Sequence, residues 1–247
     1  MQAYALTDVG RVRNMNQDYI FSSSAGIGSL ANLFIVADGM GGHKAGDYAS
    51  RYMVEQLVEY MEHQEHQGIV PALESGIQKI NREIYEESMK DERLFGMGTT
   101  LVAATVDQDT LYVANIGDSR LYLISDGIRQ VTKDHSYVEE MVSLGKMERG
   151  SKDYQAKKNI ITRAVGTKDA LNIDFFEVTL SPGDYILLCS DGLSNMVTDE
   201  EIHHIVTSDQ TLKQKAEELV SEANHHGGKD NIAVILIDPQ LSEVRSC

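Results

Sequence analysis

Apolar and polar residues alternate near the start of the chain, and the pattern then changes to a helical period. Apolar runs at 3–10, 18–24 and 33–38 predict strands, and the third run, "LFIVAD", is apolar enough to be buried. A first amphipathic helix is predicted from apolar residues at helical spacing: Ala45, Ala49, Met53, Val54, Leu57, Val58 and Met61. A second helix is predicted from a similar stripe: Val70, Leu73, Ile77, Ile80, Ile84 and Met89.

The middle of the chain contains strand patterns separated by turn signals. Between residues 99 and 132 these runs predict an antiparallel meander, with turns at 107–110, 117–118 and 126–127. Further elements are predicted in chain order: a short helix within 134–147, a surface loop over 148–159, and strands at 172–180 and 184–191 around the turn "SPGD".

The C-terminal part combines two helices with a last strand. Thr198 and Glu201 form a capping box that opens one helix, a longer helix covers 212–223, and 231–238 is a buried strand. Adjacent hairpins together with grouped helices favour an α+β layered fold over a doubly wound parallel sheet.

Composition limits the classes of protein that the chain can represent. A length of 247 residues with 42% hydrophobic content can bury one core, so we expect a single domain at 1–240 and a tail at 241–247. The 22 basic and 38 acidic residues give a net charge of −16, which opposes binding to nucleic acid or anionic membranes. Since neither a signal peptide nor a segment of ~20 apolar residues is present, we expect a cytoplasmic protein without membrane insertion.

Four acids stand at strand ends: Asp38, Asp118, Asp191 and Asp230. Any one of them is most simply a turn or cap residue. Together they favour a cation site, because clustered buried carboxylates repel one another unless a cation neutralises them. Glycines beside three of them would let the backbone approach a bound species. Ligation by oxygen alone favours Mg²⁺ or Mn²⁺ over zinc.

An arginine that could hold an anion lies near the start of the chain. Arg11 and Arg13 precede a strand that carries Gln17 and Asp18. A planar guanidinium binds phosphate oxygens through two parallel hydrogen bonds. A solvated arginine at a strand edge explains the same residues equally well.

Several common hydrolase motifs are missing from the sequence. There is no G-x-S-x-G elbow, no Walker sequence and no H-E-x-x-H helix. A cysteine phosphatase needs an arginine six residues after its nucleophile, but Asn195 stands six residues after Cys189. The commonest serine hydrolase, nucleotidase, zinc protease and cysteine phosphatase classes are therefore excluded.

The sequence resembles the metal-dependent protein phosphatases of the protein phosphatase 2C type, particularly their small bacterial members. The resemblance extends from about residue 3 to residue 237 and depends on eight blocks in family order: "GRVRNMNQD", "VADGMGGHKAGDYAS", "GMGTTLVAA", "ANIGDSRLYL", "TKDHSYVEEMV", "NIITRAVG", "LLCSDGLSNMV" and "GGKDNIAVI". It implies a four-layer α-β-β-α sandwich with two central antiparallel sheets flanked by helices.

The resemblance also implies roles for the residues that match the family motifs. Asp38 would bridge two core Mn²⁺ or Mg²⁺ ions, with the Gly39 carbonyl as a ligand of the second ion. Asp191 and Asp230 would complete the first site, and Asp118 would help to bind a third, weaker ion. Arg13 would grip the substrate phosphate. Asp18 would orient the attacking water.

By this resemblance the chain is a phosphatase of phosphoserine and phosphothreonine in proteins. Expected partners are phosphorylated proteins, including a cognate serine/threonine kinase, and the expected state is a monomer. Met40 stands where animal members carry a histidine, which leaves the general acid open between metal-bound water and His43. Residues 144–162 correspond to a variable flap beside the active site.

Two other functions stay open at this point. A two-metal phosphodiesterase or nuclease also uses clustered acids, although the charge of −16 opposes a polyanionic substrate. A metal-binding regulatory domain could recognise phosphoproteins without turnover, but it has no chemical reason to keep every acid together with Arg13.

Overall fold

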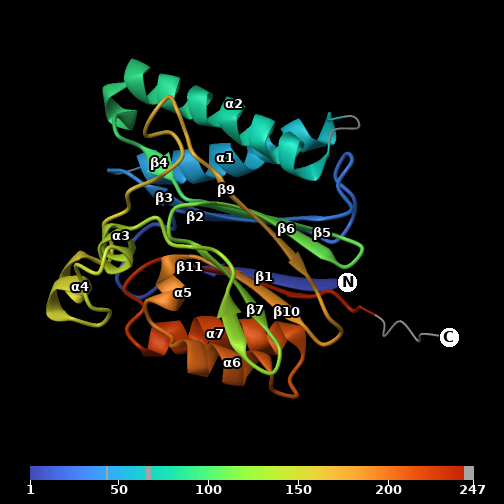
Figure 1. The fold of residues 1–247 in the computed structure, drawn as a ribbon. Helices are drawn as coiled ribbons and strands as arrows, with labels where there is room; N and C mark the ends of the chain where they lie inside the picture. Colours follow the sequence, from blue (N-terminus) through green and yellow to red (C-terminus); the bar gives the residue numbers. More distant parts are fainter. Residues whose placement is uncertain (43, 65–67, 242–247) are drawn as a thin grey trace.

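Two antiparallel sheets lie face to face between two layers of helices (Figure 1). The computed structural model describes residues 1–42, 44–64 and 68–241. This arrangement confirms the predicted α+β fold with four layers. No helix in the described ranges combines the length and the apolar character needed to cross a membrane.

One sheet joins the two ends of the chain. Its five strands follow the order β1 (Gln2–Asp8), β11 (Ile232–Asp238), β10 (Tyr185–Cys189), β7 (Arg120–Ile124) and β8 (Ile128–Gln130). The first and last strands of the sequence pair antiparallel along their whole length, from Gln2 opposite Asp238 to Asp8 opposite Ile232. The N-terminal loop that follows β1 is thereby placed beside the segment that precedes β11.

The second sheet is built mostly from the first half of the chain. Its strands follow the order β2 (Asp18–Ser23), β3 (Leu33–Met40), β5 (Leu101–Asp107), β6 (Thr110–Ile116) and β9 (Asp174–Thr179), and β4 (Gly98–Thr99) pairs with the end of β3. Strand β3 has a buried residue at every position from Leu33 to Ala37, as its continuous apolar run predicts.

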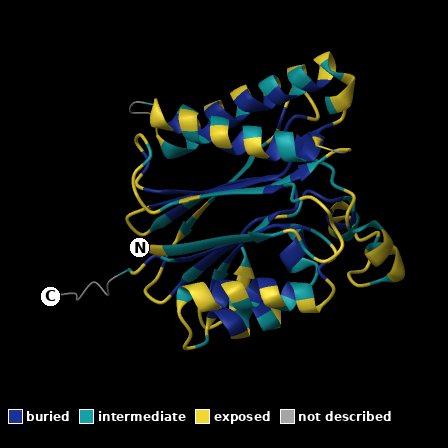
Figure 2. Ribbon diagram, turned by 180° about the vertical axis from the view of Figure 1, so that it is seen from behind, coloured by how far each residue is buried: buried dark blue, intermediate teal, exposed yellow. Residues whose placement is uncertain are grey.

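Helices cover the outer face of each sheet. The second sheet is covered by α1 (Ala45–Glu62) and α2 (Ile69–Lys90), and the first sheet by α6 (Asp199–Val206) and α7 (Leu212–His225) (Figure 1). The capping box predicted at Thr198 opens α6. Three apolar clusters fill the spaces between the four layers, and buried residues line the facing sides of helices and sheets (Figure 2).

Short helical segments lie along the connections. They are the 3₁₀ turn η1 (Glu92–Leu94), α3 (Tyr137–Ser143), α4 (Lys152–Lys157) and α5 (Asp191–Ser194). Helix α4 lies within the stretch 148–159 that was predicted to be a loop, so that prediction is wrong for 152–157. Ser151 caps α4 by accepting a hydrogen bond from the Tyr154 amide, a local signal that the polar composition concealed.

The predicted meander over 99–132 is wrong at its central turn. Strands β5 and β6 form one hairpin and β7 and β8 another, but β6 pairs with β9 in the second sheet while β7 pairs with β10 in the first. Gly117-Asp118 is therefore a crossing between sheets, and it carries Asp118 to the edge where the sheets meet. The prediction for Met89 is also wrong, since this residue is 61% exposed at the end of α2.

Candidate active site

Five acids from distant parts of the sequence meet at one edge of the two sheets. Asp18 and Asp38 face each other in the register of β2 and β3, and Asp191 begins α5 directly after β10. The Asp38 carboxyl interacts electrostatically with four other carboxyls: those of Asp18, Asp118, Asp191 and Asp230. We call these five residues the acid cluster. Convergence of the acids is the arrangement that the sequence predicted.

The backbone at Asp38 is held by hydroxyl-bearing residues. The Asp38 carbonyl accepts hydrogen bonds from the Thr100 amide at 2.8 Å and from Thr99 Oγ1 at 2.9 Å. The Asp38 amide donates to Thr100 Oγ1 at 2.9 Å, and that oxygen lies 2.7 Å from Ser119 Oγ. These threonines and Ser119 are buried. With its backbone fixed in this way, Asp38 can direct its carboxyl toward the other acids.

Ser190 ties Asp18 to the opposite sheet. Its hydroxyl donates to Asp18 Oδ2 at 2.6 Å and accepts from the Ala233 amide at 2.9 Å. Asp18 stands on β2 in one sheet, whereas Ser190 and Ala233 belong to β10 and β11 or their ends in the other. A buried serine thus holds the two sheets together where the acids gather.

Arg13 pairs with a member of the acid cluster. Its Nη2 lies 2.7 Å from Asp230 Oδ2, with half of the Arg13 side chain exposed. Asn231 anchors the loop that carries Arg13, because its side-chain amide donates to the carbonyls of Val9 and Met15, each at 2.9 Å. This pairing of the predicted phosphate-binding arginine with a predicted metal ligand could not be read from the sequence.

Glycines beside the acids are required by contacts within the chain. A Cβ atom on Gly39 would lie 2.1 Å from the Gly46 carbonyl oxygen, and one on Gly192 would lie 1.8 Å from the Asn231 carbonyl oxygen. Both distances are shorter than real contacts allow. Close backbone packing therefore explains these two glycines without any bound species.

Burial and mutual repulsion raise the pKa of most of these acids. Burial raises the pKa of Asp18 and of Asp118 to about 8, with the Asp191 charge adding to each shift. Burial, and then the Asp230 charge, raise the pKa of Asp191 to about 6. Burial and the Asp18 charge raise the pKa of Asp38 well above its ordinary value. A cluster of this kind favours whatever neutralises it, either protons or cations.

Three carboxylate oxygens in the cluster are buried without a hydrogen-bond partner among the described residues. They are Oδ1 of Asp18, of Asp118 and of Asp191. Burying such an atom without a partner costs free energy, and an ion is one of the few explanations. Oxygen ligands suit Mg²⁺ and Mn²⁺. The residues present therefore fit a hard divalent cation at this position.

The predicted metal ligands do not form a complete ligand set among the described residues. Within the described ranges, no group of three His, Cys, Asp or Glu side chains already has the arrangement of a metal site. Asp230 in particular has both oxygens in use, since Oδ2 accepts from Arg13 and Oδ1 accepts from the Asn231 amide at 2.9 Å. The carboxylates that fit a divalent cation most directly are therefore those of Asp18, Asp118 and Asp191.

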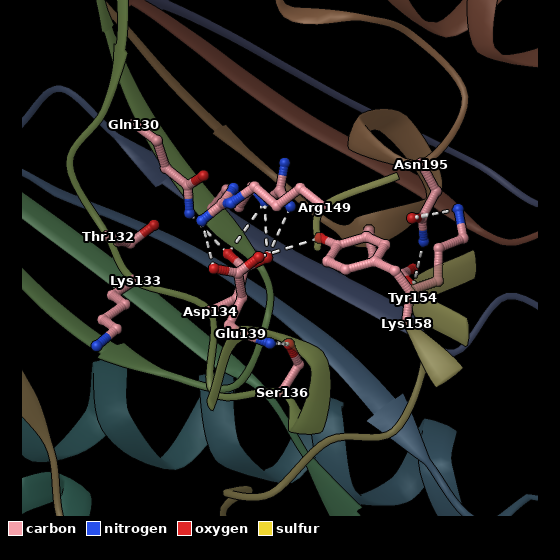
Figure 3. A network of polar contacts seen from close by, with 12 residues as sticks. Gln130, Thr132, Lys133, Asp134, Ser136, Glu139, Arg149, Tyr154, Lys158 and Asn195 are labelled. Carbon is pink, nitrogen blue, oxygen red and sulfur yellow. Dashed lines mark hydrogen bonds and ion pairs between the residues drawn. The ribbon is translucent and has the colours of Figure 1, made fainter. Parts of the chain in front are cut away.

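A cavity of about 240 Å³ adjoins the acid cluster. Its lining includes Asp118 and Asp191 of the acid cluster, and Tyr154 and Lys158, which lie in and directly after α4. The predicted flap, 144–162, therefore borders the site. It is fastened to α3, because Arg149 pairs with Glu139 and the Tyr154 hydroxyl donates to the same carboxylate at 3.0 Å (Figure 3).

The sequence left the general acid open between a metal-bound water and His43. Met40 ends β3, as its place in the motif requires. His43, the candidate from the sequence, lies outside the described residues. Sequence reasoning also missed the supporting residues of the site: Thr99, Thr100, Ser190, Asn195 and Asn231. Each stands inside a matched block, and its chemistry is visible only through its contacts.

Comparison with known proteins agrees with the fold and with the family that the motifs indicate. The family model for protein phosphatase 2C matches residues 11–236. The serine/threonine phosphatase stp of Listeria monocytogenes serotype 4b is 40% identical over 252 residues, covering 98% of each chain.

Solved structures give the same result. The serine/threonine phosphatase Stp1 from Staphylococcus aureus superposes with a TM-score of 0.89 at 33% identity, covering 96% of this chain and 95% of its own. The catalytic domain of the serine/threonine protein phosphatase PstP, solved in complex with two manganese ions, superposes with a TM-score of 0.82 at 32% identity, covering 95% and 96%. The chain belongs to the protein phosphatase 2C family, as its motifs predicted.

Proposed function

We propose that this protein is a metal-dependent phosphatase that hydrolyses phosphoserine and phosphothreonine in proteins. The observation that carries the proposal is the buried acid cluster. Three of its oxygens have no partner among the described residues, and its member Asp230 pairs with the half-exposed Arg13. Such a site presents ligands for hard cations next to a donor for a phosphate group. The names of the similar proteins, serine/threonine phosphatases in each case, support the same activity.

Two core ions and a third ion are proposed, as Mn²⁺ or Mg²⁺. Asp38 would hold both core ions, Gly39 would contribute its carbonyl to one, and Asp191 and Asp230 would bind the other. Asp118, buried on the crossing between the sheets, would hold the third. The two manganese ions in the PstP structure support a metal-dependent reaction.

The chain's own residues orient the substrate and the water. When bound, the ions supply a water of lowered pKa and neutralise charge on the phosphoryl oxygens. Arg13 would turn its guanidinium fork from Asp230 to the substrate phosphate, because its exposed position leaves it able to move. Asp18, held by Ser190 through Oδ2, would use its unpartnered Oδ1 to orient the attacking water.

The biological setting is proposed from the family resemblance. Natural substrates would include proteins phosphorylated by a cognate serine/threonine kinase, and that kinase itself. The protein would act in the cytoplasm as a monomer, with residues 1–240 as its catalytic domain and 241–247 as a tail. Residues 242–247 lie outside the described ranges.

The decisive experiment measures phosphate release from a phosphothreonine peptide. We expect turnover with Mn²⁺, none in EDTA, and recovery when Mn²⁺ is added back. Equal turnover in EDTA would contradict the metal-dependent reaction.

Two further assays separate the alternatives. A phosphatase should cleave p-nitrophenyl phosphate far faster than bis-p-nitrophenyl phosphate, whereas a phosphodiesterase should show the reverse. A regulatory domain should bind the phosphopeptide in the presence of Mn²⁺ and release no phosphate.

A further inference from the structure

A chain of hydrogen bonds connects the flap to the acid cluster. Lys158, which follows α4, donates from Nζ to Asn195 Oδ1 at 2.8 Å (Figure 3), and Asn195 Nδ2 donates to Asp191 Oδ2 at 2.9 Å. Asn195 stands one helical turn after Asp191, and its backbone amide donates to the Asp191 carbonyl at 2.8 Å. The short helix α5 therefore brings the two side chains onto the same face.

The lysine determines which way round the asparagine amide lies. A lysine ammonium can only donate hydrogen bonds, so the atom that faces Lys158 has to be the amide oxygen. The NH₂ group of Asn195 must then face Asp191. The Asp191 carboxylate, which can only accept, favours the same orientation, and the hydrogen bond from Lys158 fixes the amide in it.

Asn195 in turn determines which oxygen of Asp191 is available. Its hydrogen bond takes up Oδ2, while Oδ1 is buried without a hydrogen-bond partner among the described residues. One oxygen is held and the other is left for a ligand. Side chains that hold a metal ligand in this manner commonly affect metal affinity by ~10- to 100-fold.

We propose that Asn195 and Lys158 are positioning residues that hold the Asp191 carboxylate with Oδ1 directed to a divalent ion, so that the flap contributes to metal affinity. This inference rests on the proposed function, because Asp191 is a metal ligand only there. Neither residue touches the reacting atoms. Their effect on the metal passes through Asp191.

The test measures Mn²⁺ binding by isothermal titration calorimetry in the absence of substrate. Asn195→Leu removes the donor to Asp191, so its Mn²⁺ affinity should fall by about 10-fold. Lys158→Met keeps the amide and loses only the group that orients it, so the loss should be smaller. Lys158→Arg should restore wild-type affinity, because a guanidinium also donates to the amide oxygen.

Two comparisons test whether a loss of Mn²⁺ affinity comes from the positioning of Asp191 or from a general change in charge or stability. Lys152→Met removes the same charge from an exposed position on α4 and should leave the affinity unchanged. The double variant Asn195→Leu with Lys158→Met should bind Mn²⁺ no more weakly than Asn195→Leu alone, since both residues act through one bond. Unchanged thermal unfolding of the metal-free variants would show that the fold is intact.

The outcomes distinguish failure of this inference from failure of the proposed function. If wild type binds Mn²⁺ but Lys158→Met matches Lys152→Met, or if the two single losses add in the double variant, the inference is wrong and the proposed function stands. If the wild-type protein binds no Mn²⁺, both are wrong.

Discussion

Two groups of charged side chains line the same cavity, and they differ in whether their carboxylates have hydrogen-bond and ion-pair partners. In the first group, Asp118 and Asp191 of the acid cluster keep buried oxygens without partners among the described residues. In the second group, Arg120 holds Asp134 through both carboxylate oxygens, at 3.0 and 2.7 Å, and Gln130 donates to the same carboxylate at 2.6 Å. Arg120 also donates to the Tyr122 hydroxyl at 2.8 Å.

The presence or absence of hydrogen-bond and ion-pair partners distinguishes a candidate ligand site from a structural ion pair more clearly than burial does. The Asp134 side chain is nearly buried, but its carboxylate pairs with the Arg120 guanidinium and accepts from the Gln130 side-chain amide. It therefore needs no bound ion. Within the described part of the chain, Arg13 is the one cation that pairs directly with the acid cluster, and its side chain is half exposed. A carboxylate whose partners are all present stabilises the fold. Buried carboxylates without partners repel one another, and a bound cation can relieve that repulsion. The following experiments test this difference.

The largest effect is expected for Asp38→Ala. Because this acid is proposed to hold both core ions, kcat on a phosphothreonine peptide should fall by at least about 10³-fold while the protein stays folded. Asp107→Ala, an exposed acid in the β5–β6 hairpin, is the matched control and should keep its activity. Retained activity in Asp38→Ala would remove the acid cluster from the mechanism.

Asp134→Ala should affect stability instead. Removing one partner of a largely buried pair leaves the Arg120 charge uncompensated, which costs about 3–5 kcal/mol. Chemical denaturation in EDTA measures the change, with Asp107→Ala expected within about 0.5 kcal/mol of wild type. A loss below about 1 kcal/mol would place Asp134 among the weak surface pairs.

Arg13→Lys tests whether phosphate binding needs only the positive charge of Arg13 or also the planar shape of its guanidinium. Lysine keeps the positive charge but cannot present a planar fork, so kcat/KM should fall about tenfold, a loss of ~1.4 kcal/mol in transition-state binding. Thermal stability should stay close to that of wild type, since exposed pairs contribute little. Arg11→Lys is the control. Equal kinetics for both variants would mean that Arg13 does not bind phosphate.

The smallest effect is the pH dependence of the metal-free protein. The folded protein raises the pKa of Asp18 and Asp118 from about 3.8 to about 8, so these groups favour folding when protonated and lose that contribution as pH rises through 8. In EDTA, Tm should fall by at least about 3 °C between pH 5 and pH 8. Mn²⁺ should reduce the decline, because deprotonation creates its ligands.

A variant shows whether the cluster causes this slope. Asp18→Asn removes one of the two groups, and the decline in Tm should become shallower. A Tm in EDTA that rises from pH 5 to pH 8 would mean that the carboxyls are already charged in the folded protein.

The sequence predicted the elements well because their signals are local. The helical stripe from Ala45 to Met61, the capping box at Thr198 and the buried run of β3 each depend on neighbouring residues only. Met89 was misassigned because it continues an apolar period at a point where α2 has reached solvent. The four acids were found because each lies in or near the end of a strand, a relation that is also local.

By itself, the sequence determined the family, most of the helices and strands, and the set of acids that are candidates for a metal site. Only the tertiary structure decided that β6 and β7 enter different sheets, since a turn signal carries no information about the strand that will pair next. The same holds for the contacts of Arg13 with Asp230 and of Asn195 with Lys158 and Asp191. Arg13 meets Asp230 across 217 positions, and Lys158 meets Asn195 across 37. Such contacts depend on packing of the whole chain.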